Sequence, residues 1–135
     1  MFYCGFSGDF CGQSTTDDVN QKSAIVILAF ANTNKDGTIT VDSPNYPTSV
    51  VGGWKSSGKK VILSVGGQNG HWDVVFNSDA SIDNFINSID RYLTQYNLDG
   101  IDLDIEDYKA PPRIVAETII KLKKKIGSKL LIVSP

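Results

Sequence analysis

Short, nearly unbroken apolar runs recur along the chain, separated by amphipathic stretches and by loops rich in Gly, Asn, Asp and Ser. Short apolar runs that end in such loops are typical of buried β-strands. The predicted strands span residues 2–6, 24–31, 59–65, 98–105 and 129–133. A small additional strand is predicted at 38–41, after a turn at 34–37 in which Gly37 suits a positive φ.

Apolar residues at helical spacing predict two well-defined amphipathic helices, at 80–95 and 111–126. The second has a proline in its first turn and ends at Gly127, as helices commonly do. Weaker patterns predict a short helix at 15–21 and another at 44–56, where a proline and two glycines interrupt the periodicity.

This alternation of strands and helices indicates an α/β fold of parallel βα units. Four units and a fifth strand amount to roughly the first half of a TIM (β/α)8 barrel, which typically needs about 250 residues. We therefore predict a partial barrel domain over residues 1–135. A complete doubly wound sheet of five strands is the alternative, but the first strand is not followed by the Gly-rich phosphate loop of that fold.

The composition and net charge limit the classes of function that we expect for this chain. Hydrophobic residues make up 41% and charged residues 21%, as in ordinary globular proteins. A net charge of -2 gives no electrostatic reason to expect nucleic acid or an anionic membrane as a partner. No apolar run approaches the roughly 20 residues of a membrane span, and no signal peptide follows Met1. Cys4 and Cys11 form a disulfide or remain free thiols; their spacing predicts no metal site, and no cofactor motif is present.

The segment 98–106 carries the candidate chemistry. Asp102, Asp104 and Glu106 alternate with apolar residues, so in a strand the three carboxylates share one face. Neighbours on that face lie about 6.5–7 Å apart, and Glu106 falls at the carboxyl end of the strand, where barrel enzymes place catalytic groups.

Like charges this close should raise at least one pKa and keep a carboxyl protonated near neutral pH, as a general acid requires. Two other interpretations exist. The acids could decorate a solvated edge strand, although strict alternation with Ile and Leu argues against this. They could also bind Mg²⁺ or Ca²⁺, although no phosphate-binding loop lies nearby.

The same residues carry a family resemblance. Asp99, Asp102, Asp104 and Glu106 fall on the DxxDxDxE signature of glycoside hydrolase family 18, the chitinase family. Its SxGG signature resembles 64–67 at the end of the third predicted strand, and 29–31 also looks like the family's second strand. The resemblance covers essentially the whole chain, aligned with the first half of the family's barrel.

The resemblance implies a retaining, substrate-assisted glycosidase that cleaves chitin or N-acetylglucosamine oligosaccharides without a cofactor. Glu106 would protonate the leaving oxygen, Asp104 would orient the substrate's acetamido group, and Asp102 would hold Asp104. Ser64 would hydrogen-bond Asp102, while Gly66 and Gly67 would leave backbone room beside the acids. The resemblance also implies secretion.

Two aromatic residues are further candidates for substrate binding. Phe30 either lines the sugar site or belongs to the core, and Trp72 either stacks on a sugar or packs within its loop. His71 is predicted at the surface, Trp54 in a helix–core contact, and the lysines of 121–125 on a solvated helix face.

The chain departs from the family's pattern in two places. Phe6 stands where the family often has an inward Tyr, and the family's later Tyr and Trp would lie beyond Pro135. The isolated chain is therefore expected to be a poor enzyme. An endo-β-N-acetylglucosaminidase of the same family, a chitin-binding lectin and a truncated, inactive product remain alternatives; the presence of Glu106 favours an enzyme.

Overall fold

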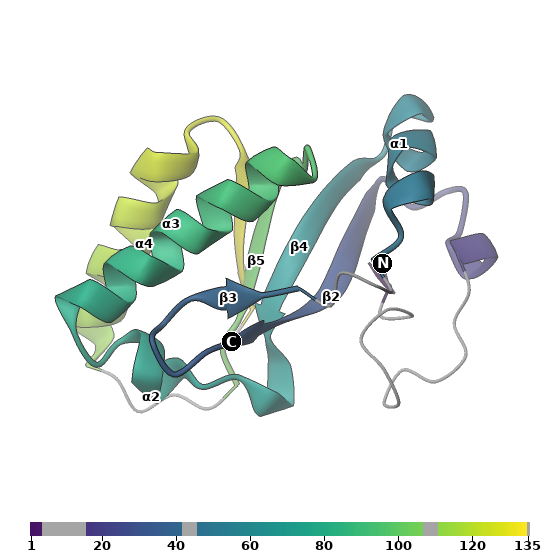
Figure 1. The fold of residues 1–135 in the computed structure, drawn as a ribbon. Helices are drawn as coiled ribbons and strands as arrows, with labels where there is room; N and C mark the ends of the chain where they lie inside the picture. The colour runs from purple at the N-terminus through teal and green to yellow at the C-terminus, as the bar shows by residue number, and fades with distance from the viewer. Residues whose placement is uncertain (4–15, 42–45, 107–110, 135) are drawn as a thin grey trace.

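A computed structural model describes residues 1–3, 16–41, 46–106 and 111–134. Its centre is a parallel sheet whose strands lie side by side in chain order (Figure 1). The order is β1 (Phe2–Tyr3), β2 (Ile25–Thr33), β4 (Lys60–Gly66), β5 (Gly100–Asp104) and β6 (Leu130–Ser134). The short strand β3 (Ile39–Thr40) pairs antiparallel with the end of β2.

The helices predicted at 44–56, 80–95 and 111–126 are present, with one addition, whereas the helix predicted at 15–21 is only a 3₁₀ turn in the described residues. They are α1 (Thr48–Ser56), α2 (Trp72–Val75), α3 (Asp79–Gln95) and α4 (Pro112–Ile126), with short 3₁₀ turns at Thr16–Asp18 and Gly67–Asn69. Figure 1 shows α3 and α4 side by side on one face of the sheet. The hydroxyl of Ser78 caps α3 by accepting from the Ser81 N–H, and α4 ends at Gly127 with φ 62°.

The hydrophobic core lies between the sheet and these helices. Alternate residues of β4 and β5 enter it and are at most 1% exposed: Val61, Leu63, Val65, Ile101 and Leu103. The residues between them point to the opposite face, where Ile62, Ser64 and Asp102 are also buried. The period-two pattern therefore divides each strand into a helix-facing apolar side and an inner side that carries the polar groups.

The strand order decides between the two predicted architectures. A doubly wound sheet reverses its strand order near the middle, whereas here each strand pairs with the next parallel strand in the chain. This order agrees with the predicted partial barrel and contradicts the doubly wound alternative.

The element boundaries differ in detail from the sequence-based prediction. The helix predicted at 44–56 begins only at Thr48, because Pro47 occupies its N-cap. The sequence did not predict α2, whose four residues are too few to show helical periodicity. Of the strand predicted at 2–6 the structure describes Phe2–Tyr3; Cys4, Phe6 and Cys11 lie outside the described residues.

The β2–β3 hairpin is held against α3 by polar contacts. Gly37 has φ 86° at the turn, and a Cβ there would lie 2.4 Å from the Ser81 carbonyl oxygen, so only glycine fits. The buried Ser88 hydroxyl accepts from the Ile39 N–H at 3.0 Å and donates to the Phe85 carbonyl. The Asn84 side chain donates to the Asp36 carbonyl at 2.8 Å.

Replacing Ser88 by alanine should therefore destabilise the fold, because the Ile39 N–H would be left buried without an acceptor. The expected loss is about 1–3 kcal/mol in the free energy of unfolding, measured by urea denaturation. Thr94→Ala, at an exposed position of the same helix, is the matched control and should change this free energy little. Equal effects of the two variants would contradict this account of the hairpin.

Candidate active site

The three predicted acids form a row that begins on the inner side of β5 and ends at Glu106, two residues beyond the strand. Asp102 is fully buried, Asp104 is half-buried and Glu106 is exposed, so the row runs from the interior of the molecule to its surface. The intervening Ile101, Leu103 and Ile105 are buried in the core, as the alternation predicts.

The Asp102 carboxylate is held from both sides by hydroxyl groups of the neighbouring strands. Ser64 on β4 donates to its Oδ2 at 2.6 Å, which confirms the predicted contact. Ser134 on β6 donates to its Oδ1 at 2.9 Å. The sequence reasoning missed Ser134 because its predicted strand stopped at residue 133. The signal that could have found it is strand register, which pairs Ser134 with Asp104.

The electrostatics of the row single out Asp104. Burial raises the pKa of its carboxyl above the usual range, and the negative charges of Glu106 and then Asp102 raise this pKa further. The like charges therefore act in the direction that the sequence predicts, but burial is the larger cause. Asp104 thus holds a proton to higher pH than an ordinary aspartate, beside an acid that reaches solvent.

Gly66 lets β4 pass close to the acid row. Its φ is 110°, and a Cβ there would lie 2.3 Å from the Asp104 carbonyl oxygen, so a side chain would separate the two strands. The indole N–H of Trp72 donates to the same carbonyl oxygen at 3.1 Å. The backbone at Asp104 is therefore fixed by a glycine on one strand and by an indole from α2.

This position corrects the expectation that Trp72 stacks on a sugar. Trp72 is only 1% exposed; its ring stacks on Phe76 at 5.8 Å and meets Phe85 edge-on at 5.7 Å. The side chain belongs to the hydrophobic core, because α2 turns it inward beneath the loop that follows β4. Trp72 supports the backbone of the acid row and has no free face for a ligand.

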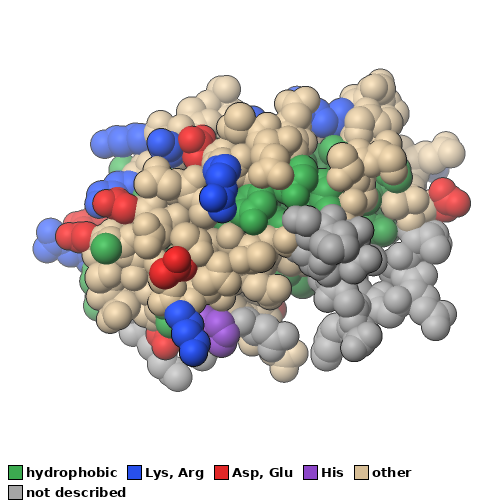
Figure 2. Space-filling view, viewed as in Figure 1, with side chains coloured by type: hydrophobic (Ala, Val, Ile, Leu, Met, Phe, Trp, Pro, Cys, Tyr) green, Lys and Arg blue, Asp and Glu red, His purple; other side chains and the backbone are tan. Residues whose placement is uncertain are grey.

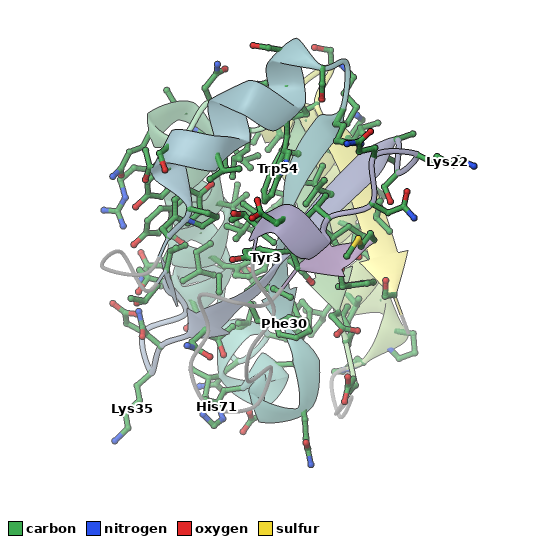
Figure 3. The ribbon with its side chains drawn as sticks, turned by 90° about the vertical axis from the view of Figure 1, so that its right-hand side faces the viewer. Tyr3, Lys22, Phe30, Lys35, Trp54 and His71 are labelled. Atoms are coloured by element: carbon green, nitrogen blue, oxygen red, sulfur yellow. The ribbon has the colours of Figure 1, made fainter. Side chains whose placement is uncertain are left out.

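Phe30 lies near the second glycine of the SxGG segment. Its half-buried ring is close enough to Gly67, which has φ 70°, that a Cβ at Gly67 would lie 3.3 Å from it. The Phe2 ring lies 6.4 Å away between centroids. Figure 3 places Phe30 between Tyr3 and the end of the molecule at which His71 lies.

Asp99, the first acid of the signature, lies apart from the row. Its carboxylate accepts from the Val61 N–H at 2.8 Å and lies 3.4 Å from the Lys55 ammonium and 4.0 Å from that of Lys60. Asp99 precedes β5, so these contacts join the amino ends of β4 and β5. The role of Asp99 is structural.

Surface features agree with the remaining predictions. His71 and the lysines of 121–125 are exposed, and Trp54 packs edge-on against Tyr3 at 5.7 Å in the core. On the face shown in Figure 2, basic side chains are interspersed with acidic ones and form no single patch. Within the described ranges, no three potential metal-ligating side chains gather, and no helix has the length and apolar character needed to cross a bilayer.

The raised pKa of Asp104 predicts an unusual pH dependence of stability. Because the folded-state pKa is above the unfolded one, the contribution of Asp104 favours folding at low pH and is lost as pH rises through the folded-state pKa. Asp104→Asn should therefore gain stability relative to the wild type as pH rises toward neutral. Urea denaturation across the acid-to-neutral range measures this difference.

Asp99→Asn is the control with the opposite expected sign. It weakens the contacts with two lysines and with the Val61 N–H, so at neutral pH it should unfold more easily than the wild type. If Asp104→Asn lost as much stability as Asp99→Asn at neutral pH, the unfavourable contribution of the ionised Asp104 carboxylate to folding would be refuted.

The sequence of this chain is similar to those of known proteins. The family model described as Glycosyl hydrolases family 18 matches residues 4–132. Chitinase 1 of Tulipa saxatilis subsp. bakeri is 37% identical over 91 residues, 63% of this chain and 29% of the tulip protein. Exochitinase 1 of Streptomyces olivaceoviridis is 34% identical over 86 residues, 56% of this chain and 14% of that protein.

A solved structure shows the same arrangement of strands and helices. The crystal structure of a Streptomyces coelicolor protein assigned as chitinase A superimposes with a TM-score of 0.81 at 30% identity, covering 99% of this chain and 48% of that one. The chain thus spans less than half the length of each of these three relatives, and its sheet is part of a TIM barrel. With nearly the whole chain matched by the family model, this protein belongs to glycosyl hydrolases family 18.

Proposed function

We propose that the protein hydrolyses β-1,4-linked N-acetylglucosamine polymers such as chitin, with Glu106 as its catalytic acid. The observation that carries this proposal is the graded acid row of Asp102, Asp104 and Glu106 on one side of β5. Relatives named as chitinases in plants and bacteria support the choice of substrate. Because such a polymer lies outside the cell, we also infer that the protein is exported.

The exposure of each acid suits a different step. Glu106 reaches solvent, so it can give its proton to the glycosidic oxygen as the bond to the anomeric carbon breaks. The substrate's own acetamido oxygen attacks that carbon and forms an oxazolinium ion, while Asp104 orients and stabilises the acetamido N–H. Water then opens this ion, with Glu106 taking the water's proton, and the product keeps the β configuration.

The placement of the acids favours this route over the ordinary retaining mechanism. That mechanism needs a second carboxylate on the opposite side of the sugar, about 5–5.5 Å from the acid, to form a covalent intermediate. The two acids that form the row with Glu106, Asp102 and Asp104, both come from β5, before Glu106 in the chain, and not from an opposing element. We therefore assign Asp104 to the substrate's amide and not to nucleophilic attack.

The remaining residues would shape the sugar site. We propose that Phe30 lines this site, because its half-buried ring lies over the backbone of Gly67. Gly66 and Gly67 let the carboxyl end of β4 approach the Asp104 backbone and the Phe30 ring, where a side chain would be crowded. Ser64 keeps Asp102 in place beneath Asp104.

The sheet described here is open, so we expect full activity only from the full-length protein. Its outer strands are β1 and β6, where Phe2, Leu130 and Val133 are between 38% and 48% exposed. An open sheet leaves apolar side chains and backbone groups in water, and the isolated chain should turn over poorly.

Substitutions of the acids in the full-length protein should follow an order. Glu106→Gln removes proton donation and should lower kcat on chitin oligomers by about 10²–10⁴-fold. Asp104→Asn should also be severe, because the acetamido group loses its anionic partner, and Asp102→Asn should be milder. Glu117→Gln, an exposed change on α4, is the matched control and should leave kcat unchanged.

If Asp102→Asn lowered kcat more than Glu106→Gln, the assignment of roles along β5 would be wrong. A wild-type protein that bound N-acetylglucosamine oligomers without cleaving them would instead identify a lectin. Cleavage of N-glycans in preference to chitin oligomers would identify an endo-β-N-acetylglucosaminidase.

The substrate-assisted route predicts a strict requirement for the acetamido group. An oligomer with a hydroxyl or a free amine in its place at the cleaved unit should bind but hardly turn over, because it lacks the nucleophile. The N-acetylated parent should first release the β-anomer, which NMR detects before mutarotation. Efficient cleavage of the plain glucan oligomer, or initial release of the α-anomer, would return the site to two-carboxylate chemistry.

A further inference from the structure

Because Asp102 is buried, its hydrogen bonds determine how its carboxylate is held in the acid row. The residue is fully buried, so a carboxylate oxygen that lost its donor could not turn to water instead. Each of its two oxygens accepts from a different serine, one on the strand before β5 in the sheet and one on the strand after it. With donors on opposite sides, the plane of the carboxylate is fixed in the inner face of the sheet.

Ser134 is itself held in place by the strand pairing. Its carbonyl oxygen accepts from the Ile105 N–H at 2.8 Å, between Asp104 and Glu106 in the chain, and its register partner is Asp104. The same residue therefore binds the backbone that carries the two outer acids and the side chain of the innermost one. Ser64 contacts the row only from the other side, through Oδ2.

We propose that Ser134 is a positioning residue for the acid row: its hydroxyl fixes the Asp102 carboxylate beneath Asp104 during the reaction. This inference rests on the proposed function and assigns a residue outside both sequence signatures to the same site. Among the described residues, the titratable groups that act on Asp104 are Asp102 and Glu106. The neighbouring strands β4 and β6 bring Ser64, Gly66, Ile132 and Ser134 to this face.

The role has a consequence for proton binding. With the Ser134 donor removed, the Asp102 carboxylate is no longer held on the β6 side and can move relative to Asp104. The negative charge of Asp102 is one cause of the raised pKa of the Asp104 carboxyl, so a change in the distance between the two carboxylates changes that pKa. Loss of the Ser134 hydroxyl should therefore alter the titration of Asp104, a residue that it does not touch.

The experiment compares Ser134→Ala, Ser134→Thr and the wild type in the full-length protein. In Ser134→Ala we expect kcat on chitin oligomers to fall about tenfold or more, with KM changed little, because the hydrogen bond to a charged group is lost. The acid limb of the pH–rate profile and the carboxyl ¹³C NMR titration of Asp104 should both shift. Ser134→Thr keeps the hydroxyl and should restore both.

Val133→Ala is the matched control. It lies on the same strand with a 41% exposed side chain on the opposite face, so it tests whether β6 is merely disturbed. It should leave kcat, the pH–rate profile and the Asp104 titration unchanged.

The outcomes separate this inference from the proposed function. An unchanged kcat and Asp104 titration in Ser134→Ala would overturn the positioning role while leaving the proposed function intact. Equal losses in Ser134→Ala and Ser134→Thr, with an equally lowered Tm, would also overturn it in favour of a purely structural role. If the wild type cleaved no N-acetylglucosamine substrate, the proposed function would fail, and the NMR titration would still decide whether Ser134 controls the acid row.

Discussion

The parallel pairing of β4 with β5 determines most of the site. This pairing sets Ser64 opposite Asp102 and Gly66 opposite Asp104. The Ser64 hydroxyl can therefore donate to the Asp102 carboxylate, and Gly66 allows the close approach of the Asp104 backbone. The close approach at Gly66 also brings the Asp104 carbonyl within reach of the Trp72 indole. A shift of one residue in this register would turn the acids toward the helices and the leucine and isoleucines toward the inner face.

Burying negative charge is the main destabilising feature of the acid row. The surroundings that compensate for it differ from one acid to the next. Asp102 is wholly buried and has two hydroxyl donors. Asp104 is partly open and retains its proton to higher pH, because burial and two nearby charges oppose its ionisation. Glu106 is exposed and is the acid that water and a substrate can reach. Sites of this kind commonly trade stability for function.

Much of the fold and part of the site could be predicted from the sequence because both rest on simple periodicities. The period-two alternation around Asp102 places the acids on one face, and the helical period of 80–95 identifies α3. Trp72 was partly misjudged because a loop residue has no periodicity that tells whether it points inward; four residues of helix decide this. Ser134 was missed because its role comes from a strand neighbour about thirty residues away in the chain, and a serine at the end of an apolar run gives no local signal.

The depth gradient along β5 also explains why adjacent acids on one strand can have different roles. Neighbours on the same face of a strand are about 6.5–7 Å apart, so one step moves a carboxylate from the protein interior toward solvent. Over that distance the surroundings change from hydroxyl donors to partial burial and then to water. The order of the acids in the sequence thus fixes their order of burial, with the backbone at Asp104 held by Trp72 and that of Ile105 by Ser134. A strand with its acids in another order would present the same carboxylates but would place the proposed proton donor where no substrate could reach it.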